Sequence, residues 1–265
     1  SPEALRRQLE WCFLHELGPG SLPEAGIEEL EIFGLVVPHA GYVYSGPVAA
    51  HAYYLLSRAR KPDVVVLLGP NHTGLGAPVA IDGNDKWETP LGAVPVDSDC
   101  ASLIIEISGV VEVDSEAHRH EHSIEVQLPF LQYVLGEFKI VPVAMLLQNY
   151  EVSKALGRAL AEISKRFRAL VVATTDLTHY EPQSAALEKD RAALSKILEL
   201  DSKGLYDVVV ERDISMCGHG PVMALLEAAR SLGCSRAELL KYATSGHVTG
   251  DTSSVVGYAS VAIYS

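Results

Sequence analysis

Three short motifs carry side chains that can bind a metal ion. His39 lies in PHAGY, His72 in GPNHTG, and Cys217 in MCGHGP at the start of a predicted helix, where the helix N-terminus favours a thiolate. Imidazoles bind transition metals as neutral ligands, and a thiolate adds a soft anionic donor. Two histidines and one cysteine leave coordination positions open, as catalytic metal sites do. We therefore expect these three residues to hold a metal, with the alternative that the histidines only hydrogen-bond to backbone in tight turns.

The segment TTDLTHY adds a carboxylate and an imidazole three residues apart, Asp176 and His179. A carboxylate that orients an imidazole is a common arrangement for a general base. Asp176 can instead cap the turn that leaves the preceding strand. Because His179 lies in the same segment, we favour a catalytic role for both residues.

The stretch HRHEHSIE contains three alternating histidines, His118, His120 and His122. Such a triplet can chelate a metal, but at the start of a solvated helix it is more often only a polar face. Glu121 and His122 directly precede an apolar helix face, so they are the members expected to turn inward. We predict that these two residues lie behind the metal ligands at the pocket.

His39, His72 and His179 each follow an apolar run that is typical of a buried strand. The runs at 33–37, 64–68 and 170–173 are rich in β-branched residues, and the first two end at Pro38 and at Gly69. Ligands of open α/β sheets bind at the carboxyl ends of the strands. Three such strands, each followed by a histidine, predict one shared crevice.

The remaining pattern alternates between helices and short strands. We predict an N-terminal helix over 1–17, a helix from about Pro47 to Arg58 with proline in its first turn, a helix N-capped by Asp97, and a helix over 116–135 that Pro129 kinks. The chain has no internal repeat and no linker. The expected fold class is therefore α/β: one three-layer αβα domain over residues 1–265 with a mixed, mostly parallel central sheet.

Composition excludes several classes of function. The net charge of −13 over 265 residues argues against non-specific binding to nucleic acid or to anionic membranes. No apolar run approaches the roughly 20 residues of a membrane helix, and the first residues lack the apolar core of a signal peptide. Four cysteines without a CxxC motif suit a reduced cytoplasmic protein. Since the chain does not begin with Met, we expect a trimmed start.

Five motifs in this order, PHAGYVYSG, GPNHTG, EHSIEVQLPFL, TTDLTHY and CGHGPV, resemble those of the Memo family. The resemblance runs from about residue 33 to the C-terminus and is to the archaeal and bacterial branch, often called AmmeMemoRadiSam system protein B. It implies a fold similar to the class III, LigB-type, extradiol dioxygenases. It also implies a radical-SAM protein as a partner.

The resemblance assigns roles to particular residues. The dioxygenases hold non-heme Fe(II) with two histidines and a carboxylate, whereas the Memo pocket has His39, His72 and Cys217 in the corresponding places. His179 matches the general-base histidine of the dioxygenases, and Asp176 lies near it. The implied cofactor is Fe(II), with Cu or Zn as alternatives that suit a softer thiolate ligand.

Two further functions stay open at this point. The first is a metal-free thiol enzyme with Cys217 as nucleophile, His179 as base and Asp176 as the orienting carboxylate. The second is a binding or scaffold protein whose pocket recognises a peptide or another partner. A small molecule or a peptide is the expected ligand in each case.

Overall fold

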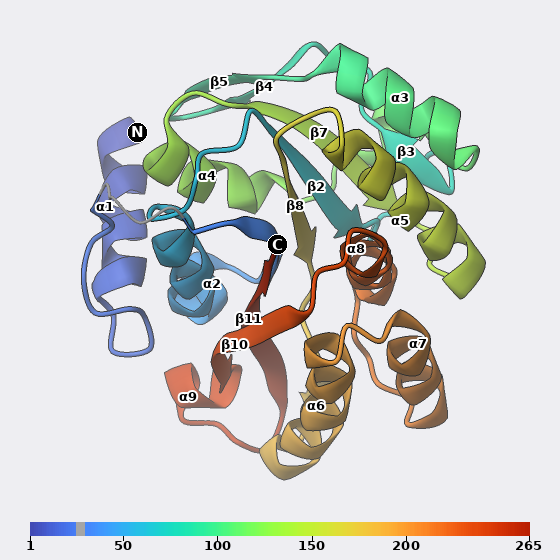
Figure 1. Ribbon diagram of the computed structural model, residues 1–265. Helices are drawn as coiled ribbons and strands as arrows, with labels where there is room; N and C mark the ends of the chain where they lie inside the picture. The colour runs from blue at the N-terminus through green and yellow to red at the C-terminus, as the bar shows by residue number, and fades with distance from the viewer. Residues whose placement is uncertain (25–29) are drawn as a thin grey trace.

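In this computed structural model, which describes residues 1–24 and 30–265, a mixed sheet runs through the centre of the molecule (Figure 1). Its core consists of four parallel strands in the spatial order β1 (Ile32–Val37), β8 (Ala169–Thr174), β2 (Val64–Pro70) and β7 (Lys139–Met145). Antiparallel pairs extend both sides. The α/β class with a mixed, mostly parallel sheet is thereby confirmed.

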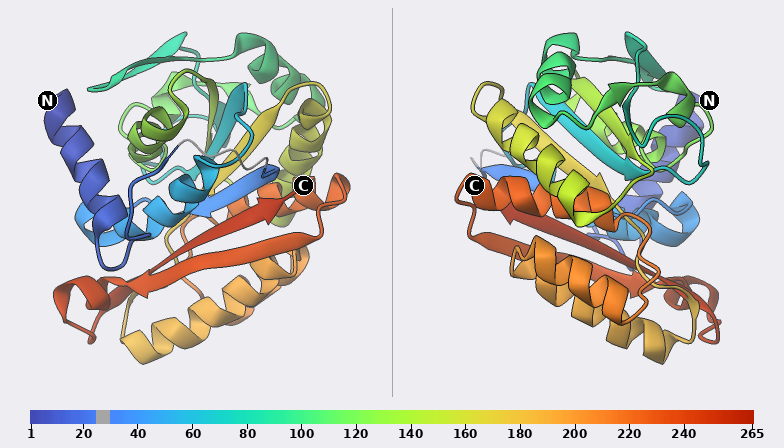
Figure 2. Two further views of the ribbon diagram at one scale, coloured as in Figure 1. Left: turned by 60° about the vertical axis from the view of Figure 1, so that its left-hand side comes forward. Right: turned by 90° about the vertical axis from the view of Figure 1, so that its right-hand side faces the viewer.

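The two sides of the sheet end differently. Next to β1 lie β11 (Val255–Tyr264) and β10 (Arg236–Thr244), which form the long edge in Figure 2, while the short β9 (His179–Glu181) also pairs with β11. Next to β7 lie the short strands β3 (Val79–Ile81) and β6 (Glu112–Val113). A separate hairpin, β4 (Lys86–Thr89) and β5 (Gly92–Pro95), stands outside the main sheet.

Helices cover both faces of the sheet and make three layers (Figure 1). One face carries α1 (Pro2–Leu14), α2 (Tyr42–Leu56) and α4 (Leu128–Leu135). The other carries α3 (Ser98–Ser108), α5 (Tyr150–Ser164), α6 (Gln183–Leu198), α7 (Ser202–Glu211) and α8 (His219–Ser231). The short α9 (Ser245–Thr249) connects β10 to β11. No helix in the described ranges is long and apolar enough to cross a membrane.

The continuous apolar run of β2 follows from this layering. Val64, Val66 and Leu68 pack into the core beneath α5 and α8, whereas Val65 and Leu67 pack into the core beneath α2 and α4. All five are buried because each face of the strand has a hydrophobic core. The strand therefore holds its carboxyl end rigidly.

The predicted starts of two helices near the site were wrong. Helix α2 begins at Tyr42, so Pro47 lies inside the helix and not in its first turn. Instead of one long kinked helix over 116–135, the chain forms two short 3-10 turns before α4, where Pro129 occupies the first turn. A proline there loses no helical hydrogen bond, so it starts the helix.

A third prediction was too long, since the N-terminal helix ends at Leu14. The prediction that Asp97 caps a helix is confirmed, because its side chain accepts a hydrogen bond from Cys100 N at the start of α3. Helix α9 and strand β9 had no counterpart in the sequence patterns.

Candidate metal centre

The carboxyl ends of three adjacent strands bring the candidate residues together. Strand β8 lies between β1 and β2, and all three run parallel. His39 follows β1, His72 follows β2, and Asp176 follows β8 after short polar turns. All three line one cavity of about 690 Å³. This is the crevice that the strand-end pattern predicts.

His39 is held in one orientation and one tautomer. It is 2% exposed, and its Nδ1 lies 2.8 Å from Thr174 Oγ1. That hydroxyl donates its own hydrogen to Val37 O at 2.9 Å, so it must accept a hydrogen bond from Nδ1–H. Burial lowers the pKa of His39 to about 4, which makes the ring neutral at pH 7. Its Nε2 therefore carries a lone pair.

His72 is oriented by the buried carboxylate of Glu121. Glu121 Oε1 lies 2.9 Å from His72 Nδ1, and Oε2 accepts the backbone N–H of His72 at 2.5 Å. Burial raises the pKa of Glu121, but the hydrogen bonds from His72 and Ser123 lower it more, to about 2. An ionised carboxylate accepts from Nδ1–H, which leaves Nε2 of His72 free for a ligand.

His122 completes a group of three imidazoles. Its ring stacks on that of His72 with centroids 5.1 Å apart, and its centroid lies 5.6 Å from that of His39. One ring nitrogen from each of the three residues can be chosen so that all lie within 4.8 Å of one another. Donors at about 2 Å from one ion lie at most about 4 Å apart, so a small movement of these side chains would let all three surround an ion.

Cys217 contacts His39 but is not a member of this group of three donors. Its Sγ is 3.3 Å from His39 Nε2 and accepts the backbone N–H of Asp176 at 3.3 Å. Helix α8 starts only at His219, after Cys217. Burial, and to a smaller extent the charge of Asp176, raises the pKa of the Cys217 thiol to about 12. The expected stabilisation of a thiolate by the helix N-terminus is therefore outweighed in the metal-free protein.

Asp176 and His179 both line the cavity but have different partners. Asp176 Oδ1 accepts the backbone N–H of His39 at 2.9 Å, and Oδ2 lies 3.9 Å from His39 Nε2. His179 Nδ1 instead donates to Ser215 O at 2.6 Å. The predicted pairing of Asp176 with His179 is thus replaced: a backbone carbonyl orients His179, and the carboxylate fixes His39.

The histidine triplet separates in space. His122 points to the site, His120 is exposed, and His118 turns to the far side, where its Nε2 lies 2.9 Å from Ala80 O. The sequence predicts Glu121 and His122 behind the candidate ligands, but in the structure His122 lies with His39 and His72. Residues two apart share a face only in an extended strand, and this segment forms turns, so the alternation did not reveal which histidine lies at the site.

A family model described as Memo-like protein matches residues 1–262. The chain belongs to this family. MEMO1 family protein MK0963 of Methanopyrus kandleri is 49% identical to it over 263 residues, covering 98% of this chain and 93% of that protein. MEMO1 family protein MTH_45 of Methanothermobacter thermautotrophicus is 50% identical over 260 residues, covering 97% and 94%. A MEMO1 family protein of Sulfolobus acidocaldarius is 48% identical over 266 residues, covering 98% and 93%.

A solved structure shares the fold of this Memo-like chain. It is the crystal structure of an uncharacterized protein, JW3007, from Escherichia coli K12, with a TM-score of 0.61 and 13% identity. The match covers 87% of this chain and 98% of that one. At this identity the likeness concerns the fold alone, and it agrees with the three-layer architecture described above.

Proposed function

We propose that the Memo-like pocket binds one transition-metal ion, with His39 and His72 as ligands. The observation that carries the proposal is the convergence of His39, His72 and His122 with their donor nitrogens within 4.8 Å of one another. Thr174 and Glu121 hold the Nδ1 atoms of His39 and His72, so both Nε2 lone pairs are available. Hydrogen-bonded outer partners of this kind are typical of metal-binding histidines.

Cys217 is the third ligand in this proposal, and His122 supplies a further imidazole. The sulfur already contacts the Nε2 atom of His39, and the backbone N–H of Asp176 points at it. The raised pKa of the thiol is no obstacle, because a bound cation displaces the thiol proton. Without the metal, the thiol donates to His39 Nε2 instead.

The donor set suits Fe(II) or copper, with zinc as the alternative. Imidazole nitrogens accept all three metals, and the thiolate shifts preference toward the softer ions. A bound iron or copper ion would supply one-electron chemistry at the cavity. The redox-enzyme and metal-handling versions of the proposal share this site and differ in whether a substrate reacts there.

His179 is the residue that can accept a proton from such a substrate. Its Nδ1–H is committed to Ser215 O, so Nε2 is the basic nitrogen, and the residue lines the same cavity as His39 and His72. A general base needs this combination of fixed orientation and access to the ligand. Asp176 acts on His39 and keeps that ring in place.

The direct test is the metal content of protein purified without oxygen. We expect about one equivalent of iron or copper per chain in the wild type, as one site implies. His39→Ala and Cys217→Ser should each lose most of it. The matched control is His120→Ala, which removes an exposed histidine two residues from His122 and should keep the wild-type content.

Two outcomes would contradict parts of the proposal. Absence of stoichiometric metal in the wild type, after anaerobic reloading with Fe(II), Cu(I) and Zn in turn, would reject the metal site. If Cys217→Ser retained the metal and His122→Ala lost it, the ligand set would be the three imidazoles, and the thiolate would be excluded as a ligand.

Two exposed tyrosines favour a second function, a metal-free pocket that recognises a peptide. Tyr44 is 43% exposed and Tyr180 is 77% exposed, and both line the cavity. Tyr180 also adopts a left-handed backbone conformation with φ of 58°, which is uncommon outside glycine and is often kept where a residue contacts a ligand. Capture of a peptide that persists in His39→Ala but not in Tyr180→Ala would favour this reading. The radical-SAM partner stays a prediction from the resemblance.

A further inference from the structure

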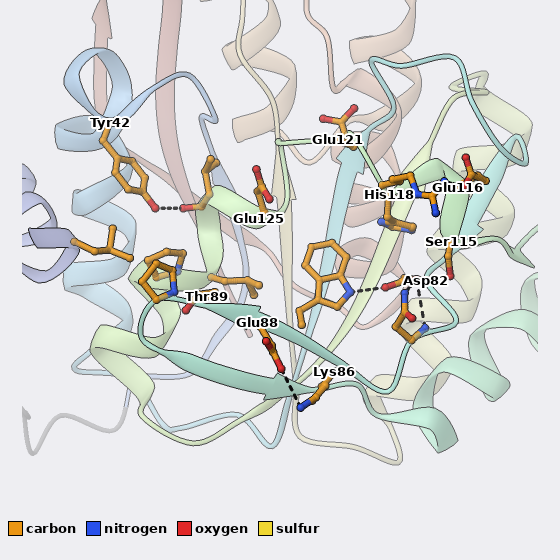
Figure 3. Close-up of a pocket in the computed structure, with 18 residues that line it drawn as sticks. Tyr42, Asp82, Lys86, Glu88, Thr89, Ser115, Glu116, His118, Glu121 and Glu125 are labelled. Carbon is orange, nitrogen blue, oxygen red and sulfur yellow. Dashed lines mark hydrogen bonds and ion pairs between the residues drawn. The ribbon is translucent and has the colours of Figure 1, made fainter. Parts of the chain in front are cut away.

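A second cavity lies on the other side of Glu121 from the metal-binding pocket. It is bounded by the β4–β5 hairpin, by the irregular segment over 115–125 and by the start of α4 (Figure 3). Its volume is about 710 Å³, within the range of roughly 300–1,000 Å³ that is usual for small-molecule sites. None of the roles proposed above uses it.

One wall of this cavity is the indole of Trp87, which is locked in place. Its Nε1 donates to Asp82 Oδ2 at 2.6 Å, and its ring meets that of His118 edge-on, with centroids 5.6 Å apart. Asp82 is itself buried and also accepts from the side chain of Asn84. The indole remains partly exposed, and an indole face attracts cations more strongly than any other aromatic side chain.

The charges around the cavity are mainly negative. The two basic residues at its rim are already paired, Lys86 with Glu88 at 2.9 Å and Arg119 with Glu116 at 2.8 Å. In the part of the chain that the structure describes, no lysine or arginine pairs with Glu125. Figure 3 shows its carboxylate beside the cavity.

Asp82 and Glu121 add to this charge. Both are buried carboxylates that line the cavity, and within the described ranges neither has a lysine or arginine partner. The hydrogen bonds of Glu121 go to His72 and to neighbouring backbone N–H groups, so its charge is only partly offset. A cation in the cavity would therefore be attracted from several sides.

His118 provides an unpaired acceptor at the same place. It is 8% exposed and lines the cavity, and its Nε2–H donates to Ala80 O. Burial lowers the pKa of His118, so the ring is neutral and Nδ1 carries a lone pair. Among the described side chains, Nδ1 is one of two buried polar atoms without a hydrogen-bond partner. Such atoms are rare and call for a donor.

We propose that this cavity binds a small organic cation that carries N–H donors, such as an alkylammonium or guanidinium compound. The carboxylates of Asp82, Glu121 and Glu125 attract the positive charge, and Trp87 offers its ring face. His118 Nδ1 is buried at the cavity wall, so the wall must open slightly before this atom accepts one of the N–H groups. Glu121 lies between this cavity and the metal site, because it also orients His72, but occupation of the cavity does not require a metal.

The test uses Trp87 as its own reporter. The chain has two tryptophans, and Trp11 lies on α1 and is exposed, so Trp11→Phe leaves Trp87 as the single fluorophore. In metal-free buffer with a chelator, agmatine carries both a guanidinium and an ammonium group and is a suitable probe. We expect a saturable change in Trp87 emission below about 10 mM agmatine, a weak but specific range. A strictly linear response would overturn the proposal.

A charge-removing variant and a matched control identify the site. In the Trp11→Phe background, Glu125→Gln should weaken agmatine binding about threefold, as expected for loss of one exposed counter-charge. Glu106→Gln makes the same change on the exposed face of α3, outside the cavity, and should leave the affinity unchanged. Equal affinity in Glu125→Gln and wild type would overturn the proposed site.

Two further measurements test the N–H donor and the acceptor. Tetramethylammonium has the charge but no N–H group, so it should bind more weakly than agmatine; equal binding would overturn that part of the proposal. In ¹⁵N-labelled protein, the Nδ1 resonance of His118 should move when agmatine saturates the site, because a lone pair that accepts a hydrogen bond is shielded. A fixed resonance would show that His118 is not the acceptor.

Discussion

The hydroxyl of Thr174 accepts a hydrogen bond from His39 Nδ1 at 2.8 Å while it donates to Val37 O at 2.9 Å. A hydroxyl has a single hydrogen, so its donation to the carbonyl fixes the direction of the bond with the histidine. The tautomer of His39 is therefore decided by the last residue of the neighbouring strand β8. This places the free lone pair on the nitrogen that faces Cys217.

The first prediction concerns that hydroxyl. Thr174→Val keeps the shape of the side chain but removes the acceptor, so His39 loses its fixed tautomer. We expect the affinity for the metal to fall by about 10- to 100-fold, the usual effect of losing an outer partner of a metal-binding histidine. Competition with a chromophoric chelator measures it. Thr252→Val, an exposed threonine, is the control, and equal affinity in both variants would contradict the role of Thr174.

The second prediction is a pH dependence of stability in metal-free protein. The pKa of Glu121 is lowered from 4.5 to about 2, so its contribution is present above pH 4.5 and is lost as the pH falls. The pKa of His72 is raised above 6.5, chiefly by its hydrogen bond to Glu121, so its contribution is present below pH 6.5 and is lost as the pH rises through the raised pKa. The Glu121–His72 pair therefore stabilises the fold most between pH 4.5 and pH 6.5.

Glu121→Gln tests this window. The variant should lower the free energy of unfolding by about 1.5–3 kcal/mol near pH 5.5, the cost of losing a hydrogen bond to a charged group. The loss should shrink near pH 3 and above pH 8. Urea unfolding at each pH, with a chelator present, provides the measurement. A loss that is constant across this range would show that the charge of the pair is unimportant.

The third prediction concerns the reactivity of Cys217. With its pKa raised to about 12, the thiol should react with iodoacetamide at pH 8 at least about 100-fold more slowly than a free cysteine. Mass spectrometry of the peptide that contains Cys217 follows the reaction and separates it from the other three cysteines. Rapid alkylation in the folded, metal-free protein would instead favour the thiol-enzyme reading.

The fourth prediction concerns the close approach of backbone beside Cys217. A Cβ on Gly218 would lie 2.3 Å from Thr174 O and 2.7 Å from Thr175 Cβ, so Gly218→Ala must push the two segments apart. We expect a loss of about 1–3 kcal/mol in the free energy of unfolding, as for other overpacked sites, together with loss of metal. Gly41→Ala meets only a side-chain atom at 3.7 Å and is the matched control. Wild-type stability of Gly218→Ala would contradict this packing.

The strand-end residues were predictable from the sequence because the signal is local. The apolar runs before His39 and His72 end at proline and glycine, and buried strands in a parallel sheet leave their next polar residues at one edge. The pattern could not show that β8 lies between β1 and β2, since strand order depends on packing across the whole chain. That order is what puts Thr174 against His39.

The position of His122 was harder to predict from the sequence, for a physical reason. The apolar spacing of residues 124–135 predicts a helix, but Glu121 accepts the backbone N–H groups of His122 and Ser123 and so competes with the helical pattern. This competition exists only when His72 anchors the carboxylate from a distant strand. The contact of Asp176 with His39 and the cavity around Trp87 likewise depend on segments that are distant in the sequence, so local patterns did not predict them.

The insertion of β8 between β1 and β2 also sets an order of events during synthesis. His39 and His72 leave the ribosome early, but the strand that separates and aligns them comes about 100 residues later in the chain, and Cys217 follows after that. Long-range pairing of this kind forms late in folding. If the proposed site binds a metal, a nascent chain has only scattered histidines and no site, and tight metal binding marks completed folding. A pulse-labelled chain should acquire its metal only after release.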